Sequence, residues 1–247
     1  EGMSSHTPGV TYQWEKSDNA GAVWNPIGGA TSASYTTGIT TYANDHDDQY
    51  RCVISAVGAA TPATTNAVVL TVQRTFSITA QPSNATANEG ATANFTVTVS
   101  TSSGSPTYQW ERSDDGGANY ASIGSATSAT YTTPTLVFAN DNADRYRVVA
   151  SLVGAAASIT STHGELTVLR VISIGTQPAS TAVIEGGQGT FNIVASITSG
   201  AISYQWQKSI NSGANWSNIS GANSATYTTP NTVFPTTPSE QFRCILT

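Results

Sequence analysis

The chain has 247 residues, too many for one β-sandwich of about 100 residues and suited to two or three such modules. Only 10% of the residues are charged, and short β-branched runs lie between Gly, Pro and Asn clusters, as in all-β proteins. A formal charge of -6 with only two lysines, Lys16 and Lys208, leaves no basic stripe for nucleic acid, and no run of about 18 apolar residues could insert into a membrane.

Four short segments mark the first module, residues 1–74. In chain order they are Tyr12-Gln13-Trp14, residues 33–37, Asp48-Gln49-Tyr50-Arg51-Cys52 and Leu70-Thr71-Val72, and their aromatic and β-branched residues predict strands. Only eleven residues precede Tyr12. We therefore expect this module to lack its first strand and most of its second.

The same segments return at a constant spacing of 96 residues, which indicates a tandem repeat. Module 2, residues 75–170, is the complete copy, and the alternation in Phe95–Val99 predicts a half-buried strand. Further strands are expected around residues 108–110, 129–131, 146–150 and 166–168. Module 3, residues 171–247, is expected to stop inside the strand equivalent to 146–150. We expect a longer polypeptide, or strands donated by a neighbouring subunit, to complete the two outer modules.

Repeated aromatic residues define the predicted core. Burying one large apolar side chain stabilises a fold by about 1.5–3 kcal/mol, so these residues are expected to dominate stability. The predicted core residues are Trp14, Trp110, Trp206, Tyr35, Tyr131, Tyr227, Tyr50, Tyr146, Phe242, Cys52 and Cys244. The sequences that join the modules, residues 70–78 and 166–174, hold no Gly/Ser linker, which predicts a semi-rigid rod.

A Trp followed by Asp-x-Tyr-x-Cys, here Trp14 and Asp48–Cys52, resembles the immunoglobulin superfamily over the whole chain. The resemblance implies tandem Greek-key β-sandwiches. It also implies that Tyr50 and Tyr146 form the tyrosine corner, a hydrogen bond from the hydroxyl to upstream backbone, which Phe242 cannot form. The amino-acid sequence of the repeat is most similar to immunoglobulin-like repeats of bacteriophage virion proteins and bacterial surface proteins.

The cysteines depart from the antibody pattern. Cys52 and Cys244 occupy the same position of modules 1 and 3, and Phe191 and Ile193 stand where module 3 would need a partner cysteine. Because equivalent sites of non-adjacent modules cannot approach within about 7 Å, we expect two reduced core thiols. The lack of a disulfide favours folding in a reducing cytosol.

No catalytic constellation is present. His6, His46 and His163 lie at non-equivalent repeat positions, and we expect no enzymatic activity and no cofactor. Acidic turns at 44–48 and 140–144 offer oxygens to Ca²⁺, but Asn and Asp also cap turns, and Pro235-Thr236-Thr237-Pro238 replaces them in module 3. The turn interpretation is favoured over a calcium site.

A second repeated feature is an aromatic residue that lies three positions before an isoleucine in every module. The aromatic residues are Trp24, Tyr120 and Trp216, and they precede Ile27, Ile123 and Ile219. These rings are candidates for contact with sugars or neighbouring subunits, although covering the sandwich edge is the more common use of such a residue.

The leading functional hypothesis is a structural or accessory module of a phage particle, of the tail-fibre or capsid-decoration type, exposed on the virion surface. Its partners would be other virion subunits and host surface glycans or proteins. The alternative is a bacterial cell-surface adhesin or filament subunit, and a third class is an enzyme that carries these modules as spacers.

Overall fold

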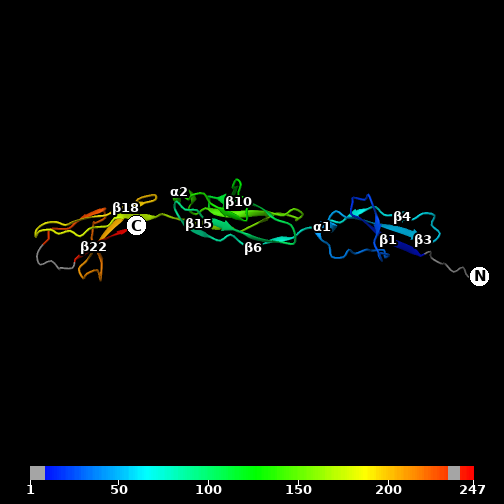
Figure 1. Cartoon of the computed structure of the whole chain (residues 1–247), viewed down its shortest axis with the longest axis horizontal. Coiled ribbons are helices and arrows are strands. Elements are labelled where there is room, and N and C mark those ends of the chain that lie inside the picture. The colour runs from blue at the N-terminus through cyan, green and yellow to red at the C-terminus, as the bar shows by residue number, and fades with distance from the viewer. Residues whose placement is uncertain (1–8, 233–239) are drawn as a thin grey trace, which may run out of the picture.

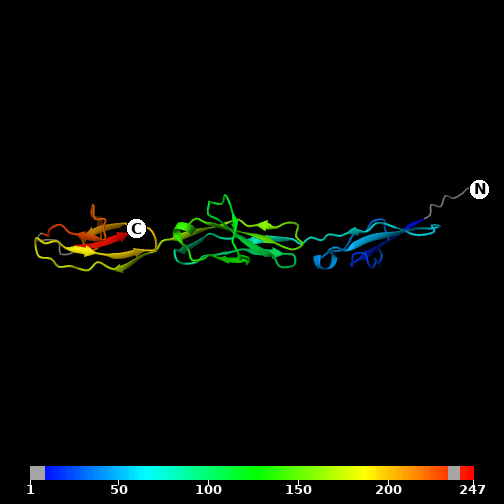
Figure 2. The ribbon, with the colours of Figure 1, turned by 90° about the horizontal axis from the view of Figure 1, so that it is seen from above.

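The computed structural model describes residues 9–232 and 240–247. Its three modules follow one another in a row, and neither of two perpendicular views shows one module folded back on another (Figures 1 and 2). Almost all regular elements in these ranges are strands, and the two helices described, α1 (Tyr42–Asp45) and α2 (Phe138–Asp141), are single turns. The expected all-β class is confirmed.

Module 2 is a two-layered sandwich. One layer has the strand order β11-β10-β13-β15-β7, with β14 also paired to β13; the other contains the pairs β12-β8 and β6-β9. The strands are β6 (Phe76–Ala80), β7 (Ala85–Asn88), β8 (Asn94–Thr96), β9 (Thr98–Thr101), β10 (Thr107–Ser113), β11 (Ala121–Ser122), β12 (Thr130–Thr132), β13 (Arg145–Ser151), β14 (Ile159–Thr160) and β15 (Gly164–Leu169). All pairs are antiparallel except β15 with β7.

The predicted strand over residues 95–99 is divided at Val97. Its first half, β8, pairs with β12, and its second half, β9, pairs with β6. The chain thus changes partner within one strand, while Phe95 and Val97 both stay buried on the inner face. The side-chain alternation that predicted this segment survives the division because the pleat continues through it.

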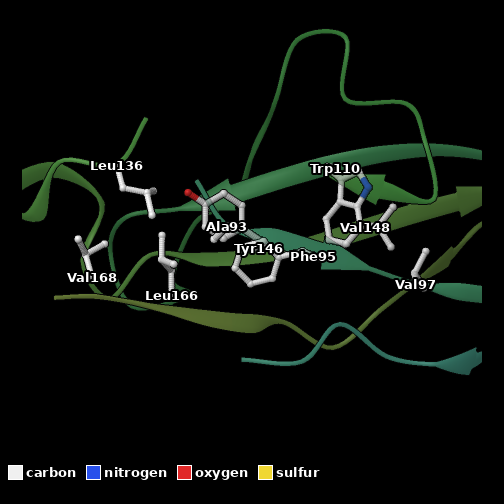
Figure 3. Packing of buried hydrophobic residues seen from close by; sticks show 9 residues of the cluster. All are labelled: Ala93, Phe95, Val97, Trp110, Leu136, Tyr146, Val148, Leu166 and Val168. Atoms are coloured by element: carbon white, nitrogen blue, oxygen red, sulfur yellow. The ribbon is translucent and has the colours of Figure 1, made fainter. Parts of the chain in front are cut away.

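The core of module 2 lies between the two layers (Figure 3). Trp110 has no exposed surface and faces Val148 across the β10–β13 pair, while the ring centroids of Phe95 and Tyr146 are 4.5 Å apart. The buried cluster contains Ala93, Phe95, Val97, Trp110, Leu136, Tyr146, Val148, Leu166 and Val168.

The described part of module 1 forms one sheet. It contains β1 (Val10–Ser17), β2 (Asn25–Pro26), β3 (Gln49–Ala56), β4 (Ala63–Thr64) and β5 (Val68–Val69), in the order β2-β1-β3-β4 with β5 also on β3. Trp14 lies opposite Cys52 but is half-buried, because no second layer covers this sheet within the described residues.

Two strands predicted in module 1 do not form. Residues 33–37 are not a strand, since the described residues hold no partner equivalent to β8. Leu70–Val72 is also outside any strand, since it lacks the parallel partner that β7 gives to β15. Leu70 still exchanges backbone hydrogen bonds with residues 47 and 48, as Leu166 does with residues 143 and 144. The repeat preserves these contacts even where the ladder is missing.

Module 3 has three sheets among its described residues: β20-β19-β22, β16-β18 and β17-β21. Its strands are β16 (Ile172–Thr176), β17 (Thr190–Asn192), β18 (Val194–Ile197), β19 (Tyr204–Ser209), β20 (Ser217–Asn218), β21 (Thr226–Thr228) and β22 (Gln241–Leu246). Trp206 is fully buried opposite Cys244. Cys244 is only half-buried, in contrast to Cys52, because among the described residues β22 pairs with β19 alone, whereas β3 pairs with β4 and β5 as well as β1.

Candidate functional site

The three predicted contact aromatics are each covered by an arginine. The Cζ atoms of Arg51, Arg147 and Arg243 lie 4.2, 3.8 and 4.3 Å from the ring centroids of Trp24, Tyr120 and Trp216 respectively. Glu15 and Glu111 hold the first two arginines through Nε at 2.7 Å, and Gln207 holds Arg243 at 2.8 Å. All three rings are half-buried. One face of each ring is therefore occupied by a guanidinium, in the geometry of a cation–π contact.

A buried serine that was not among the predicted residues orders the turn before each of these aromatics. Ser17, Ser113 and Ser209 are at most 2% exposed, and each Oγ accepts the backbone N–H of the glycine four residues later, at 2.8–2.9 Å. Each also donates to the Asn or Asp two residues later. The signal was visible as Ser-x-Asn/Asp-x-Gly repeating every 96 residues. Glycine is required at this position because its φ is +86° to +92°.

In module 2 the Asn/Asp position of this turn is Asp115. Its carboxylate accepts the backbone N–H and the side-chain amide of Asn119, at 2.9 and 2.8 Å. The N–H of Asn119, followed by the hydroxyl of Ser113, holds the pKa of Asp115 well below its usual range.

The acidic turns pair with basic side chains. Lys16 Nζ lies 2.5 Å from Asp48 Oδ2 and 3.3 Å from Asp45 Oδ1, and the contact with Asp48 raises the pKa of Lys16. Arg112 Nε lies 2.6 Å from Asp144 Oδ2. Burial raises the pKa of Asp144, and the guanidinium opposes that rise.

Two of these carboxylates also cap turns. Asp45 Oδ2 accepts the N–H of Thr41 at 2.8 Å, and Asp141 Oδ2 accepts that of Val137 at 2.7 Å. No group of three or more His, Cys, Asp or Glu in residues 9–232 and 240–247 is arranged to hold a metal ion. The corresponding segment of module 3, residues 235–238, lies outside the described residues.

The tyrosine corner is not formed, and that assignment was wrong. The hydroxyl of Tyr146 donates to Asp144 Oδ2 at 3.3 Å rather than to backbone, and Tyr50 has no hydroxyl hydrogen bond within the described chain. The reason is the Asp144–Arg112 pair, which lies at the hydroxyl end of the Tyr146 ring. Burial raises the pKa of Tyr146, consistent with a phenol kept neutral.

At each junction between modules, an arginine of the connecting segment stacks on an aromatic ring of the preceding module. The Cζ of Arg74 lies 4.0 Å from the ring centroid of Tyr42 in module 1, and its Nε and Nη1 donate to Ser103 Oγ and Val153 O of module 2, at 3.2 and 2.9 Å. Its backbone N–H donates to Gly154 O at 2.8 Å.

The second junction repeats this contact 96 residues later. Arg170 lies 3.9 Å from the ring of Phe138. In addition, Glu89 of module 2 accepts the hydroxyls of Thr198 and Ser199 of module 3, at 2.6 and 2.7 Å, which lowers its pKa. These interactions support the expected restriction of bending.

A hollow of about 500 Å³ lies in module 2 beside the β10–β11 connection. Arg112, Tyr120, Ser122, Tyr131, Thr135 and Asp141 are among its lining residues, and we call it the β10–β11 hollow. The equivalent residues Lys208, Trp216, Asn218, Tyr227 and Asn231 lie around the β19–β20 connection of module 3, and all but Asn218 line a hollow there. Two of the predicted contact aromatics therefore line hollows.

His46, one of the three histidines, takes part in the packing of the first junction. His46 Nδ1 accepts the N–H of Val72 at 3.2 Å, and its ring stacks on Tyr42 with centroids 4.3 Å apart. His46 therefore supports the first junction, where Asn142 does the same for Val168 in module 2. His6 lies outside the described residues. No helix within the described ranges is long and apolar enough to cross a membrane.

Comparison with known proteins gives one family and a set of similar folds. A family described as a domain of unknown function (DUF8696) matches residues 2–74, 77–170 and 173–247. No curated protein matches the sequence. A three-domain immunoglobulin structure of titin is similar with a TM-score of 0.50 and 13% identity, covering 96% of this chain and 83% of that one.

Two further solved structures are similar at lower scores. The three N-terminal domains of the highly immunogenic outer capsid protein of bacteriophage RB49 give a TM-score of 0.34 at 14% identity, covering 99% of this chain and 83% of theirs. Immunoglobulin domains 1–5 of Sidekick-1 give 0.40 at 15%, covering 95% and 51%. The titin likeness, together with the sandwich of module 2, shows a tandem immunoglobulin-like fold.

Proposed function

The chain belongs to the DUF8696 family in three consecutive copies, and from that premise we propose that it is a non-enzymatic spacer and adhesive rod on a biological surface. The observation that carries the proposal is the repeated junction. Arg74 and Arg170 stack on an aromatic residue of the preceding module at 4.0 and 3.9 Å, so consecutive modules are held end to end. Such a chain projects whatever it carries away from its point of attachment.

The use of charged groups supports a structural rather than a catalytic role. Asp48 and Asp144 are buried and paired with Lys16 and Arg112, and Glu15 and Glu111 hold the arginines that cover Trp24 and Tyr120. These groups are engaged in holding strands and turns together. Catalysis instead uses acids and bases that converge on an open site.

We assign the rod to a phage particle, as a tail-fibre or capsid-decoration module that reaches toward the host. One support is the sequence motif of the repeat, Tyr-Gln-Trp followed by Ala-Thr-Tyr-Thr-Thr. The other is that the two cysteines form no disulfide. Free thiols suit a protein that folds in a reducing cytosol before the particle is released. A bacterial cell-surface adhesin is the alternative.

The test is to locate the full-length protein with an antibody raised against residues 75–170. We expect the antibody to label purified phage particles in electron micrographs and to detect the protein after the particles have been banded by density. Labelling of the cell envelope, with none on particles, would overturn the phage assignment and favour the adhesin. Small-angle scattering of the chain checks the spacer role, since a compact particle would contradict it.

A further inference from the structure

The β10–β11 hollow is built by parts of module 2 that come from both layers of the sandwich. Arg112 and Ser122 lie on β10 and β11, Tyr131 lies on β12, and Thr135 lies in the segment leading to α2. Its volume of about 500 Å³ falls within the range of about 300–1,000 Å³ that is usual for small-ligand sites. The hollow therefore has room for one or two sugar rings.

Unused hydrogen-bonding groups line this hollow. The hydroxyls of Tyr131, Ser122 and Thr135 make no hydrogen bond to any described residue. Tyr131 is half-buried, its ring is fixed by Trp110 and Tyr146 at centroid distances of 6.2 and 5.6 Å, and burial raises its pKa. A half-buried hydroxyl held in place without a protein partner is poised to bond a ligand.

The charges of the lining select against an anion. Arg112 is the cation of the β10–β11 hollow, and it is already paired with Asp144 at 2.6 Å and Asp141 at 3.5 Å. Asp114 adds a second lining carboxylate, and the whole chain carries a formal charge of -6. A negatively charged ligand would meet more carboxylate than guanidinium.

Part of this lining recurs at the hollow of module 3, which is larger, at about 970 Å³, and extends to residues 178–183. Trp216 and Tyr227 replace Tyr120 and Tyr131, and Asn231 replaces Thr135. Two modules thus combine aromatic rings with hydroxyl or amide groups at one repeated place. An arginine covers one face of Tyr120 and of Trp216, so a pyranose would place its apolar C–H face against the opposite face of the ring. Hydroxyls and amides suit the edge of the sugar.

We propose that the β10–β11 hollow and its equivalent in module 3 are subsites for a neutral oligosaccharide. The proposal rests on the proposed surface role, because it names what the rod contacts. Individual subsites are weak, and the two hollows on one chain raise the avidity for a polymer that reaches both.

The test is a titration of the whole isotope-labelled chain with maltotriose, cellotriose and chitotriose, followed by amide chemical shifts. We expect millimolar binding of at least one of these sugars, with shifts confined to residues 120–122 and 131–135 and to residues 216–218 and 227–231. Trigalacturonic acid, a charged trisaccharide, is expected to bind more weakly. Binding by none of the neutral sugars, shifts elsewhere, or preference for the acid would overturn the proposal.

Tyr131→Phe tests the hydroxyl without removing the ring from the core. We expect about five- to tenfold weaker binding at module 2, corresponding to one lost hydrogen bond. Tyr108→Phe removes a hydroxyl from β10 that does not line the hollow, and it is expected to leave binding unchanged. Equal affinities of the two variants would refute the subsite. If no sugar binds but particles are still labelled, the surface role stands and only the subsite fails.

Discussion

Equivalent tryptophans in this repeat differ in burial, and their contributions to stability should differ in the same way. Trp110 is fully buried between two layers, whereas Trp14 is half-buried on a single layer. We expect Trp110→Ala to lower the free energy of unfolding of module 2 by about 3–5 kcal/mol, and Trp14→Ala to cost module 1 clearly less. Urea unfolding followed by resolved methyl signals of each module measures both costs, and equal costs would contradict the role given to the second layer.

Asp115 makes the turn of module 2 sensitive to acid, and its Asn equivalents do not. Its pKa is lowered by the N–H of Asn119, so its carboxylate contributes stability above the usual Asp pKa of about 3.9, and this is lost as the pH falls toward the lowered value. Asp115→Asn places at this position the residue found at Asn19 and Asn211. We expect the stability of module 2 to depend less on pH in the acidic range in this variant. Urea midpoints measured across acidic pH check it; parallel profiles for the two proteins would exclude the effect.

The burial of the repeated tryptophans in modules 2 and 3 was predictable from sequence. The spacing of 96 residues placed Trp110 and Trp206 in the inner layers from sequence alone. It did not place the hydroxyl of Tyr146, because its partner is decided by a buried ion pair whose members, Asp144 and Arg112, lie 32 residues apart in sequence. The Ser113 turn was missed because each serine was considered alone in a Ser-rich chain, although the motif Ser-x-Asn/Asp-x-Gly repeats every 96 residues.

At the level of elements, strand formation depended on partners that pattern alone does not supply. Residues 33–37 and 129–133 have nearly the same sequence, yet only the second contains a strand, β12, because β8 is there to pair with it. A sequence reports the preference of a segment for extended backbone. Whether a ladder forms depends on which other segment lies beside it.

The junction element yields a prediction about flexibility. Arg74→Ala removes the stacking on Tyr42 and the bonds to Ser103 and Val153. We expect a broader range of angles between modules 1 and 2, detected as smaller residual dipolar couplings in module 1 relative to module 2. Arg51→Ala is the matched control, because Arg51 stacks on Trp24 within one module. If both variants behaved alike, the junction would not depend on Arg74.

At the scale of the whole molecule, modules are joined by few contacts and should unfold separately. Repeat proteins with small interfaces behave as nearly independent units. Trp110→Ala is therefore expected to reduce hydrogen-exchange protection throughout module 2 while leaving the amides around Trp206 protected. Simultaneous loss of protection in modules 2 and 3 would show that Glu89 and Arg170 couple them more strongly than their contacts indicate.

The repeated arginine contact also has a geometric consequence. Because Arg74 and Arg170 stack on equivalent aromatic rings at 4.0 and 3.9 Å, we expect each module to be related to the one before it by a similar rotation and translation. Repeating one such operation generates a screw axis. An array of these domains is then a one-dimensional helical lattice, in which every loop and hollow returns at a fixed rise and azimuth. Any ligand bound along it must match that pitch.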